Sequence, residues 1–333
     1  MPTTKDTAAL RNQLWDDHPI VTATAHISTI PLLKAYKQIK RRARRARSSV
    51  AFWANPLTGK SFAIEVIVNL LRRDYPGCAV VSYEASSKSK NRTPESFKEQ
   101  VWVPTSMGGF LDSMLDSLDY EPKRQRLNSD KKKQLKCALY AASVASRRLF
   151  LIIDEAQELI EAEFCWLKEI INFLSKKDIR VMVILFGQSE LKARRTLLES
   201  EGRSDLGVRF IKKLMEFEGI RTCDELEAFL RECDENSQFP DDSGLTYTHF
   251  LWPQAFEAGF RLASCAQDLW TALTESAPLT TSNKWVKMQW VAHTISEFAD
   301  LTKNKDGACF VSSLELWRRA LNKTDYPSQA LAA

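Results

Sequence analysis

Short apolar runs alternate with amphipathic segments along the first two thirds of the 333-residue chain. Such runs are typical of strands in a parallel sheet that is covered by helices on both faces. They occur at 49–53, 78–83, 147–155, 179–186 and 214–218. Between them, apolar residues recur at the three- and four-residue spacing of amphipathic helices. The pattern therefore predicts an α/β fold with a parallel sheet.

The last third of the chain follows a different pattern. Beyond residue 221 the apolar residues keep a helical spacing, and we expect helices at 223–233, 253–275, 284–303 and 311–321. Within the first part, a helix is expected to begin at Ser129 or Asp130, which are both good N-caps, and to run to about residue 147. The sequence thus predicts an α/β domain followed by an all-helical part.

A phosphate-loop motif lies between the first predicted strand and the helix after it. It reads Ala54-Asn55-Pro56-Leu57-Thr58-Gly59-Lys60-Ser61. In this setting, backbone N–H groups at the helix N-terminus surround the phosphates of a nucleotide. Lys60 is expected to reach the β- and γ-phosphates, and Ser61 to hold Mg²⁺. Ala54 stands where the motif usually has its first Gly, and a chance Gly-Lys-Ser at a helix start is the alternative.

Two acids, Asp154 and Glu155, end the apolar run at 147–155. Acids at the carboxyl end of a parallel strand project into the crevice where α/β sheets bind their ligands. There Asp154 could bind Mg²⁺, directly or through water, and Glu155 could orient and deprotonate an attacking water. The alternative is a helix N-cap followed by an acid in the first turn.

Composition narrows the class of protein. A hydrophobic content of 44% with 27% charged residues is ordinary for a globular protein, and no apolar stretch approaches the length of a membrane span. The seven cysteines are odd in number and show no Cys-x-x-Cys spacing, so we expect reduced thiols and a cytoplasmic location. The four isolated histidines suggest no metal site. The net charge of +5 is mild, so any contact with nucleic acid must come from local patches.

Three segments are rich in lysine and arginine. The segment 34–47 has eight cations, no acid and one apolar face, which predicts a helix docked on the sheet. The polar loop 86–94 carries side chains that contact phosphate oxygens, and we expect it to bind double-stranded DNA through Lys88, Lys90, Arg92 and Thr93. A solvated helix face and a plain surface loop are the respective alternatives, and the segment 34–47 is the competing site for DNA. The segment 123–136 is expected to be a solvated helix face.

Four motifs together resemble those of the AAA+ ATPases, and within them the TnsC/TniB group of DNA-transposition regulators. The phosphate loop is similar to the AAA+ form, with Ala54 and Leu57 in place of two glycines. The segments 154–157, 186–191 and 206–210 resemble the Asp-Glu-Ala-Gln, Gly-Gln-x-Glu-Leu and Leu-x-x-Arg-Phe motifs of that group. The resemblance covers roughly residues 20–325.

This resemblance implies a P-loop AAA+ domain with a parallel sheet, followed by an all-helical lid. The implied parts are an N-terminal segment with a basic helix (1–48), the AAA+ nucleotide-binding domain (49–221), and the lid with a C-terminal tail (222–333). The residues expected to bind the cofactor are Asn55, Pro56, Thr58, Gly59, Lys60, Ser61 and Phe62.

The resemblance also implies roles for single residues. Gln188 would sense the γ-phosphate, and Arg209 would reach the nucleotide of a neighbouring subunit, with Arg203 as the second candidate. A helix-start polar residue and a solvated arginine are the alternatives for these positions. Lys284 and Lys287 lie where lids of this kind carry a basic sensor.

The implied function is that of an ATPase that uses ATP and Mg²⁺ and assembles as a homo-oligomeric ring or filament on double-stranded DNA. Its partners would be a transposase and a target-selector protein, with no membrane involved. Two other functions stay open at this point. One is an AAA+ motor that acts on protein partners, and the other is a nucleotide-gated scaffold with little hydrolysis.

Overall fold

The structure, a computed structural model, describes residues 10–45, 49–85, 106–280 and 284–326. The chain divides into two compact units. The sheet unit comprises Ala35–Pro56 and Ala63–Phe217, and the helical unit comprises Met1–Lys34, Leu57–Phe62 and Glu218–Ala333. These units are defined by packing alone, so the functional division at residues 48 and 221 stays a prediction.

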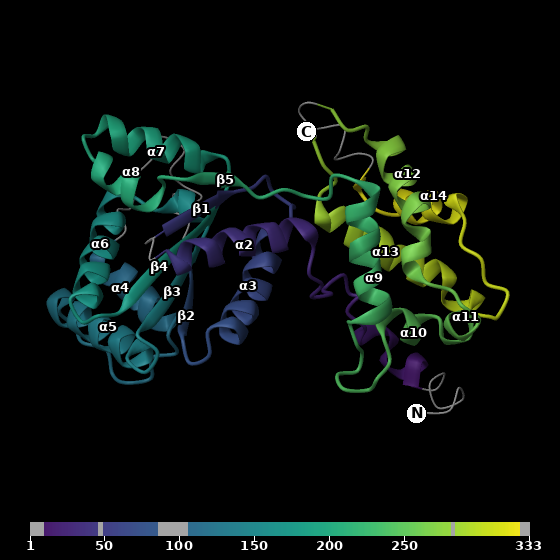
Figure 1. The fold of residues 1–333 in the computed structure, drawn as a ribbon, viewed down its shortest axis with the longest axis horizontal. Coiled ribbons are helices and arrows are strands. Elements are labelled where there is room, and N and C mark those ends of the chain that lie inside the picture. The colour runs from purple at the N-terminus through teal and green to yellow at the C-terminus, as the bar shows by residue number, and fades with distance from the viewer. Residues whose placement is uncertain (1–9, 46–48, 86–105, 281–283, 327–333) are drawn as a thin grey trace, which may run out of the picture. The chain divides into compact units, whose positions relative to one another are not determined.

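Five parallel strands form the centre of the sheet unit, in the order β2-β3-β4-β1-β5 (Figure 1). Every pairing is parallel, and β1 pairs with β4 from Ser49↔Val183 to Trp53↔Gly187. The predicted α/β fold is confirmed, and the apolar runs match the strands to within two residues at each end. The strands are β1 Ser49–Trp53, β2 Ala79–Glu84, β3 Arg148–Asp154, β4 Arg180–Gly187 and β5 Leu214–Glu216.

Helices cover both faces of this sheet. α2 and α3 lie on one side, and α4, α5 and α6 lie on the other (Figure 1). On the second side, alternate strand residues such as Leu151 and Val183 are buried against Leu111 of α4 and Leu167 of α6. The helices are α2 Ile30–Arg44, α3 Lys60–Asp74, α4 Met107–Asp116, α5 Asn128–Ser143, α6 Glu161–Ser175, α7 Glu190–Ser200 and α8 Ser204–Phe210.

The bounds of α5 differ from those predicted. The helix begins at Asn128, and its N-cap position is held by Leu127 with no side-chain hydrogen bond, so neither Ser129 nor Asp130 is the cap. It ends at Ser143 rather than near residue 147, because Arg147 takes a left-handed backbone conformation (φ +55°) that leads directly into β3.

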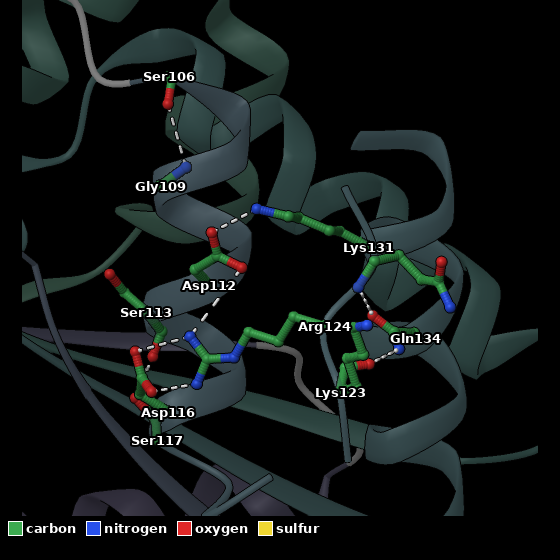
Figure 2. Close-up of polar contacts among 11 residues, drawn as sticks. Ser106, Gly109, Asp112, Ser113, Asp116, Ser117, Lys123, Arg124, Lys131 and Gln134 are labelled. Atoms are coloured by element: carbon green, nitrogen blue, oxygen red, sulfur yellow. Dashed lines mark hydrogen bonds and ion pairs between the residues drawn. The ribbon is translucent and has the colours of Figure 1, made fainter. Parts of the chain in front are cut away.

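The basic segment 123–136 is solvated only in part: Lys133 is 79% exposed, as predicted, whereas three other lysines bind acids of neighbouring helices. Lys131 Nζ lies 2.5 Å from Asp112 Oδ2 on α4 (Figure 2). Lys132 and Lys136 each place Nζ 2.7 Å from an oxygen of Glu169 on α6. Their side chains are only 14–21% exposed, because α5 packs between α4 and α6. These cations are therefore neutralised by acids of neighbouring helices.

The helical unit encloses an aromatic core. The rings of Phe298 and Trp317 stack with centroids 3.7 Å apart, and Trp252 Nε1 donates to Thr302 Oγ1 at 3.0 Å. Among the helices of the described residues, none has both the length and the apolar character that crossing a membrane requires. The α-helices of the unit are α9 Cys223–Glu235, α10 Tyr247–Leu251, α11 Pro253–Glu257, α12 Ala266–Ser276, α13 Met288–Thr302 and α14 Leu314–Asn322.

Two helices predicted in this unit are shorter or broken. The segment 253–275 is interrupted after α11, where Gly259 takes φ +101° and the carboxylate of Asp234 accepts the N–H groups of Leu262 and Ala263 at 2.9 Å. The helix expected at 284–303 begins only at Met288, since Val286 is extended and forms an antiparallel bridge with Ile220. Both differences come from contacts distant in sequence.

Candidate functional site

The phosphate-loop motif connects the carboxyl end of β1 to the first residue of α3, as predicted. Ala54 is 1% exposed, and its N–H donates to the carbonyl of Gly187 at the end of β4, at 2.9 Å. Ala54 keeps an ordinary backbone conformation, so this position does not need the glycine that the motif usually has. α3 begins at Lys60, and Ser61 is exposed in its first turn.

The centre of the loop has a left-handed backbone at two positions. Leu57 takes φ +68° and Gly59 takes φ +90°. Leu57 is one of the two residues that replace a glycine of the AAA+ motif, and a side chain in this conformation costs roughly 1–2 kcal/mol. The N–H of Gln289 donates to Leu57 O at 3.3 Å, and a Cβ on Gly59 would lie 3.2 Å from the Cβ of Met288. The start of α13 therefore packs against the loop.

The other residues predicted to bind the cofactor lie in or next to the phosphate loop. Asn55 and Pro56 come directly after Ala54, and Thr58 is buried at 1% exposure. The ring of Phe62 stacks on His26 with centroids 5.1 Å apart. Lys287 is the residue before α13, the helix whose start packs against the loop.

A closed hydrogen-bond network surrounds Glu155. Its Oε2 accepts from Nε2 of Gln157 at 2.5 Å and from Nε2 of Gln188 at 3.1 Å. Gln157 Oε1 in turn accepts the backbone N–H of Gln188 at 2.9 Å. Glu155 has a left-handed backbone (φ +49°), and its N–H donates to Asp154 Oδ1 at 2.7 Å. The network fixes the carboxylate of Glu155 at the carboxyl ends of β3 and β4.

Sequence reasoning gave no role to Gln157, which joins the two predicted residues Glu155 and Gln188. The signal was the Asp-Glu-Ala-Gln motif, whose last residue is this glutamine. The structure shows why the position is restricted: Gln157 is 8% exposed, and a Cβ on Gly187 would lie 2.8 Å from its Oε1. Gly187 is therefore needed for the close approach of this side chain.

The residues around the loop and the strand ends fit ATP and Mg²⁺. α3 has fifteen residues and offers the N–H groups of its first turn, with Lys60 at its first position. The described residues contain no group of three or more His, Cys, Asp or Glu side chains that could hold a metal ion alone. Mg²⁺ in phosphate sites keeps waters and uses one or two protein ligands beside the phosphates. Ser61 and Asp154 remain the ligands predicted from the sequence.

Comparison with known proteins agrees with this geometry. A protein-family model described as "AAA domain" matches residues 43–194, a range that contains the loop, Asp154, Glu155 and Gln188. The sheet unit accordingly has the P-loop AAA+ fold, as the sequence predicted. A search of the curated proteins finds no match.

Solved structures similar to this chain include Cdc6p from Pyrobaculum aerophilum, at 12% identity and a TM-score of 0.51. That match covers 83% of this chain and 62% of Cdc6p, so the chain spans less than two thirds of its length. The ORC1 protein of Aeropyrum pernix, solved in complex with DNA, is 13% identical, with 92% and 69% covered and a TM-score of 0.48. Domain III of DnaA from Thermotoga maritima is 14% identical, with 89% and 93% covered and a TM-score of 0.46.

Arg209 lies at the edge of the AAA sheet opposite Asp154. Its carbonyl oxygen accepts from the hydroxyl of Ser49, the first residue of β1, whereas Asp154 ends β3. Its Nε is buried without a hydrogen-bond partner among the described residues, and burial lowers the pKa of the guanidinium against the opposing effect of Asp205. Arg209 therefore does not share a site with Asp154 of its own chain.

Arg203, the second candidate, is held within its own AAA unit. It forms an ion pair with Glu161, and its Nε lies 3.2 Å from Asp205 Oδ1. Its hydrogen bonds to Cys165 and Asp205 raise the pKa of the guanidinium. These partners occupy the donors that a nucleotide of another subunit would need, which leaves Arg209 as the stronger candidate.

The predicted DNA-binding residues Lys88, Lys90, Arg92 and Thr93 lie outside the described residues, so their role stays a prediction. The other basic segment is visible as α2, which buries Leu32, Tyr36, Ile39 and Ala43 as predicted for a docked helix. Part of its charge is satisfied within the chain, since Lys34 Nζ lies 2.7 Å from Glu225 Oε1 and Lys40 Nζ lies 2.5 Å from Asp74 Oδ2.

Proposed function

We propose that the chain is an ATP-dependent DNA-binding regulator that assembles on duplex DNA and links target selection to a transposase. The observation that carries the proposal is the network in which Gln157 and Gln188 hold the carboxylate of Glu155. A carboxylate fixed in this way at the end of β3 can accept a proton from a water and keep that water in line. This chemistry suits the hydrolysis of a nucleoside triphosphate.

In this proposal ATP is held by the loop residues and the first turn of α3, and Mg²⁺ by Ser61 and Asp154. Mg²⁺ would supply neutralisation of the phosphate charge. Lys60 places its ammonium group at the β- and γ-phosphates, and Glu155 takes the proton of the attacking water. Gln188 follows β4, and its side chain binds the carboxylate of Glu155. Loss of the γ-phosphate next to Gln188 can therefore change the position of Glu155 and of the end of β4.

Oligomerisation is part of the proposal because of the position of Arg209. An arginine at the edge of the sheet away from Asp154 can serve a nucleotide only when a second subunit brings one to it. An arginine supplied from a neighbour stabilises the charge of the transferring phosphoryl group. ATP would then favour the assembled ring or filament, and hydrolysis would dissolve it.

The link to transposition rests on the resemblance of two short motifs, Asp-Glu-Ala-Gln and Gly-Gln-x-Glu-Leu. The glutamines of both motifs, Gln157 and Gln188, bind Glu155, so both motifs serve to hold this carboxylate in place. The transposase and the target selector are partners that the resemblance suggests. DNA-stimulated ATP turnover separates this function from a motor that acts on proteins, and a turnover near zero would indicate the nucleotide-gated scaffold instead.

We expect Gly187→Ala to lower ATP turnover by roughly 10- to 10²-fold while ATP still binds. The new methyl group would meet Gln157 Oε1 at 2.8 Å and Leu191 at 3.2 Å, so Gln157 must shift and release Glu155. Overpacking of this kind also lowers the free energy of unfolding by about 1–3 kcal/mol. Steady-state turnover, nucleotide titration and urea unfolding measure the three effects. Gly307→Ala is the control, because its added Cβ meets no atom within 4 Å; equal turnover in both variants would contradict the role of Gln157.

A mixing experiment tests the shared site. Subunits carrying Arg209→Ala, mixed with subunits carrying Lys60→Ala, should recover part of the DNA-stimulated turnover, because an interface with both residues intact can form between them. The control mixes Lys60→Ala subunits with a Lys60→Ala/Arg209→Ala double variant, which leaves no complete site. Full activity of Arg209→Ala alone, or recovery in the control mixture, would rule out a shared site at Arg209.

A further inference from the structure

The edge of the sheet where the strands begin is strongly basic. Because all five strands are parallel, the residues that lead into them lie along one edge. α2 ends at Arg44 just before β1, the connection before β4 carries Lys177, and Arg180 starts β4. The exposed cations at this edge include Arg44, Arg45, Lys177, Arg180, Lys212 and Lys213. None of these six forms an ion pair within the part of the chain that the structure describes.

Acids gather at the opposite edge instead. Glu84, Asp154 and Glu216 are the last residues of β2, β3 and β5, and Glu155 follows β3. At the basic edge, Asp74 is already engaged, since its carboxylate binds Lys40 and Tyr36, and these hydrogen bonds hold its pKa at about 2. The end of the sheet proposed for ATP and the basic edge are thus different surfaces with opposite charge.

A concave site lies on the basic edge. It has a volume of about 430 Å³, and its charged lining consists of Arg148, Arg180 and Arg209 with one acid, the exposed Asp178. The guanidinium of Arg148 lies 4.6 Å from the centroid of the Tyr75 ring, which holds it in place by a cation–π contact. Arg148 and Arg180 are the arginines that an entering anion would bind, because the proposed function assigns Arg209 to the nucleotide of a neighbouring subunit.

The exposed face of α2 extends this surface. Lys37, Arg41, Arg44 and Arg45 are exposed and are spaced by four, seven and eight positions, so they share one stripe of the helix. With a rise of 1.5 Å per residue, the stripe is about 12 Å long. One strand of a duplex presents a phosphate every 3.4 Å or so along its axis, so the stripe matches about three phosphates. A single small anion would contact only one or two of these cations, whereas a duplex could contact the whole stripe.

We propose that the basic edge of the sheet, with its arginine-lined site and the outer stripe of α2, binds the phosphate backbone of duplex DNA. The proposal rests on the proposed function for the choice of DNA as the ligand. Arginine suits this ligand, because its planar fork binds phosphate oxygens in pairs. The cations offer no pattern that reads base edges, so binding is independent of DNA sequence. It also leaves the ATP end of the sheet free.

The experiment measures the affinity of the full chain for a fluorescent DNA duplex as a function of salt concentration. The edge variant replaces Arg44, Arg45, Lys177 and Arg180 by Gln. Each lost phosphate contact removes about 0.9 from the slope of log K against log[salt], so the slope should flatten by up to about 3.6. Nucleotide titration should show unchanged ATP binding, since no residue of the phosphate loop is altered.

The control variant removes the same charge from cations that are paired elsewhere on the surface, by replacing Lys133, Arg195, Arg231 and Arg318 with Gln. Its salt slope should equal that of the unaltered chain. A third variant carries Arg44→Lys, Arg45→Lys and Arg180→Lys; it keeps the charge and should retain most of the slope. If this variant binds DNA and the edge variant does not, the loss comes from the missing charge and not from misfolding. Circular dichroism would detect misfolding of the edge variant directly.

The outcomes distinguish the two proposals. If the unaltered chain binds DNA and the edge variant keeps its slope, the edge is not the DNA surface, although the proposed function stands. If the unaltered chain binds no DNA, with or without ATP, the proposed function fails and the edge proposal fails with it. Binding to vesicles of anionic lipid, equally weakened in the edge variant and stronger than binding to DNA, would overturn the choice of ligand.

Discussion

Replacing Glu155 by Gln is expected to lower the rate of ATP hydrolysis by roughly 10²–10⁴-fold while leaving ATP binding intact. The substitution keeps the size of the side chain and removes its ability to take a proton. It also places an amide against the two amide donors of Gln157 and Gln188, which now bind a carboxylate oxygen at 2.5 and 3.1 Å. The base and part of the network that orients it are therefore lost together.

Single-turnover hydrolysis and equilibrium nucleotide titration separate the two effects. Assemblies on DNA should last longer with this variant, because hydrolysis is the step proposed to dissolve them. Glu158→Gln is the matched control, because it makes the same change of charge three positions further along, at the end of the same short 3-10 turn. Normal turnover by Glu155→Gln would show that Glu155 is only an acid at the start of a turn.

Replacing Lys60 by Ala is expected to weaken ATP binding by about 10²-fold or more. The ammonium group is the cation that faces the β- and γ-phosphates, and loss of one partner from such a charge pair costs about 3 kcal/mol or more. Because ATP is proposed to hold neighbouring subunits together, nucleotide-dependent assembly should be lost as well. Isothermal titration with ATP and Mg²⁺, followed by sedimentation with and without ATP, measures both effects.

The control for this variant is Arg72→Ala, which removes a cation from the exposed end of the same helix α3. It should bind ATP as the unaltered chain does. Unchanged ATP affinity in Lys60→Ala would mean that the loop is not a phosphate site, and the proposed function would then have no ligand to act on. Weakened affinity in both variants would indicate damage to α3 instead.

The sequence predicted the sheet well, because buried parallel strands leave continuous apolar runs and each run lies within a few residues of its strand. The positions of the loop, Asp154 and Glu155 could also be predicted, since the loop follows β1 and the two acids stand at the end of β3. The predicted helix at 253–275 failed for a different reason. Its break depends on the carboxylate of Asp234, which binds N–H groups 28 and 29 residues further on. No local pattern reports such a contact.

The role of Gln157 and the basic edge could not be predicted for the same reason. Gln157 matters because β3 and β4 are neighbours, which brings Gln188 within hydrogen-bond distance. The segment 34–47 is notable by itself, but the other cations of the edge come from short, ordinary runs between residues 177 and 213. Only the strand order β2-β3-β4-β1-β5 places them side by side.

Leu57 has a consequence for the thermodynamics of the phosphate loop. A leucine with φ +68° replaces a residue that, as glycine, would explore far more backbone conformations in the free protein. The loop therefore has less conformational entropy to lose when a ligand orders it, and preorganisation of this kind favours affinity. The strain of the left-handed leucine is already present in the chain without a nucleotide, so it lowers the free energy of unfolding and adds no cost to the binding step. Rigidity in this loop is thus obtained at the expense of folding free energy.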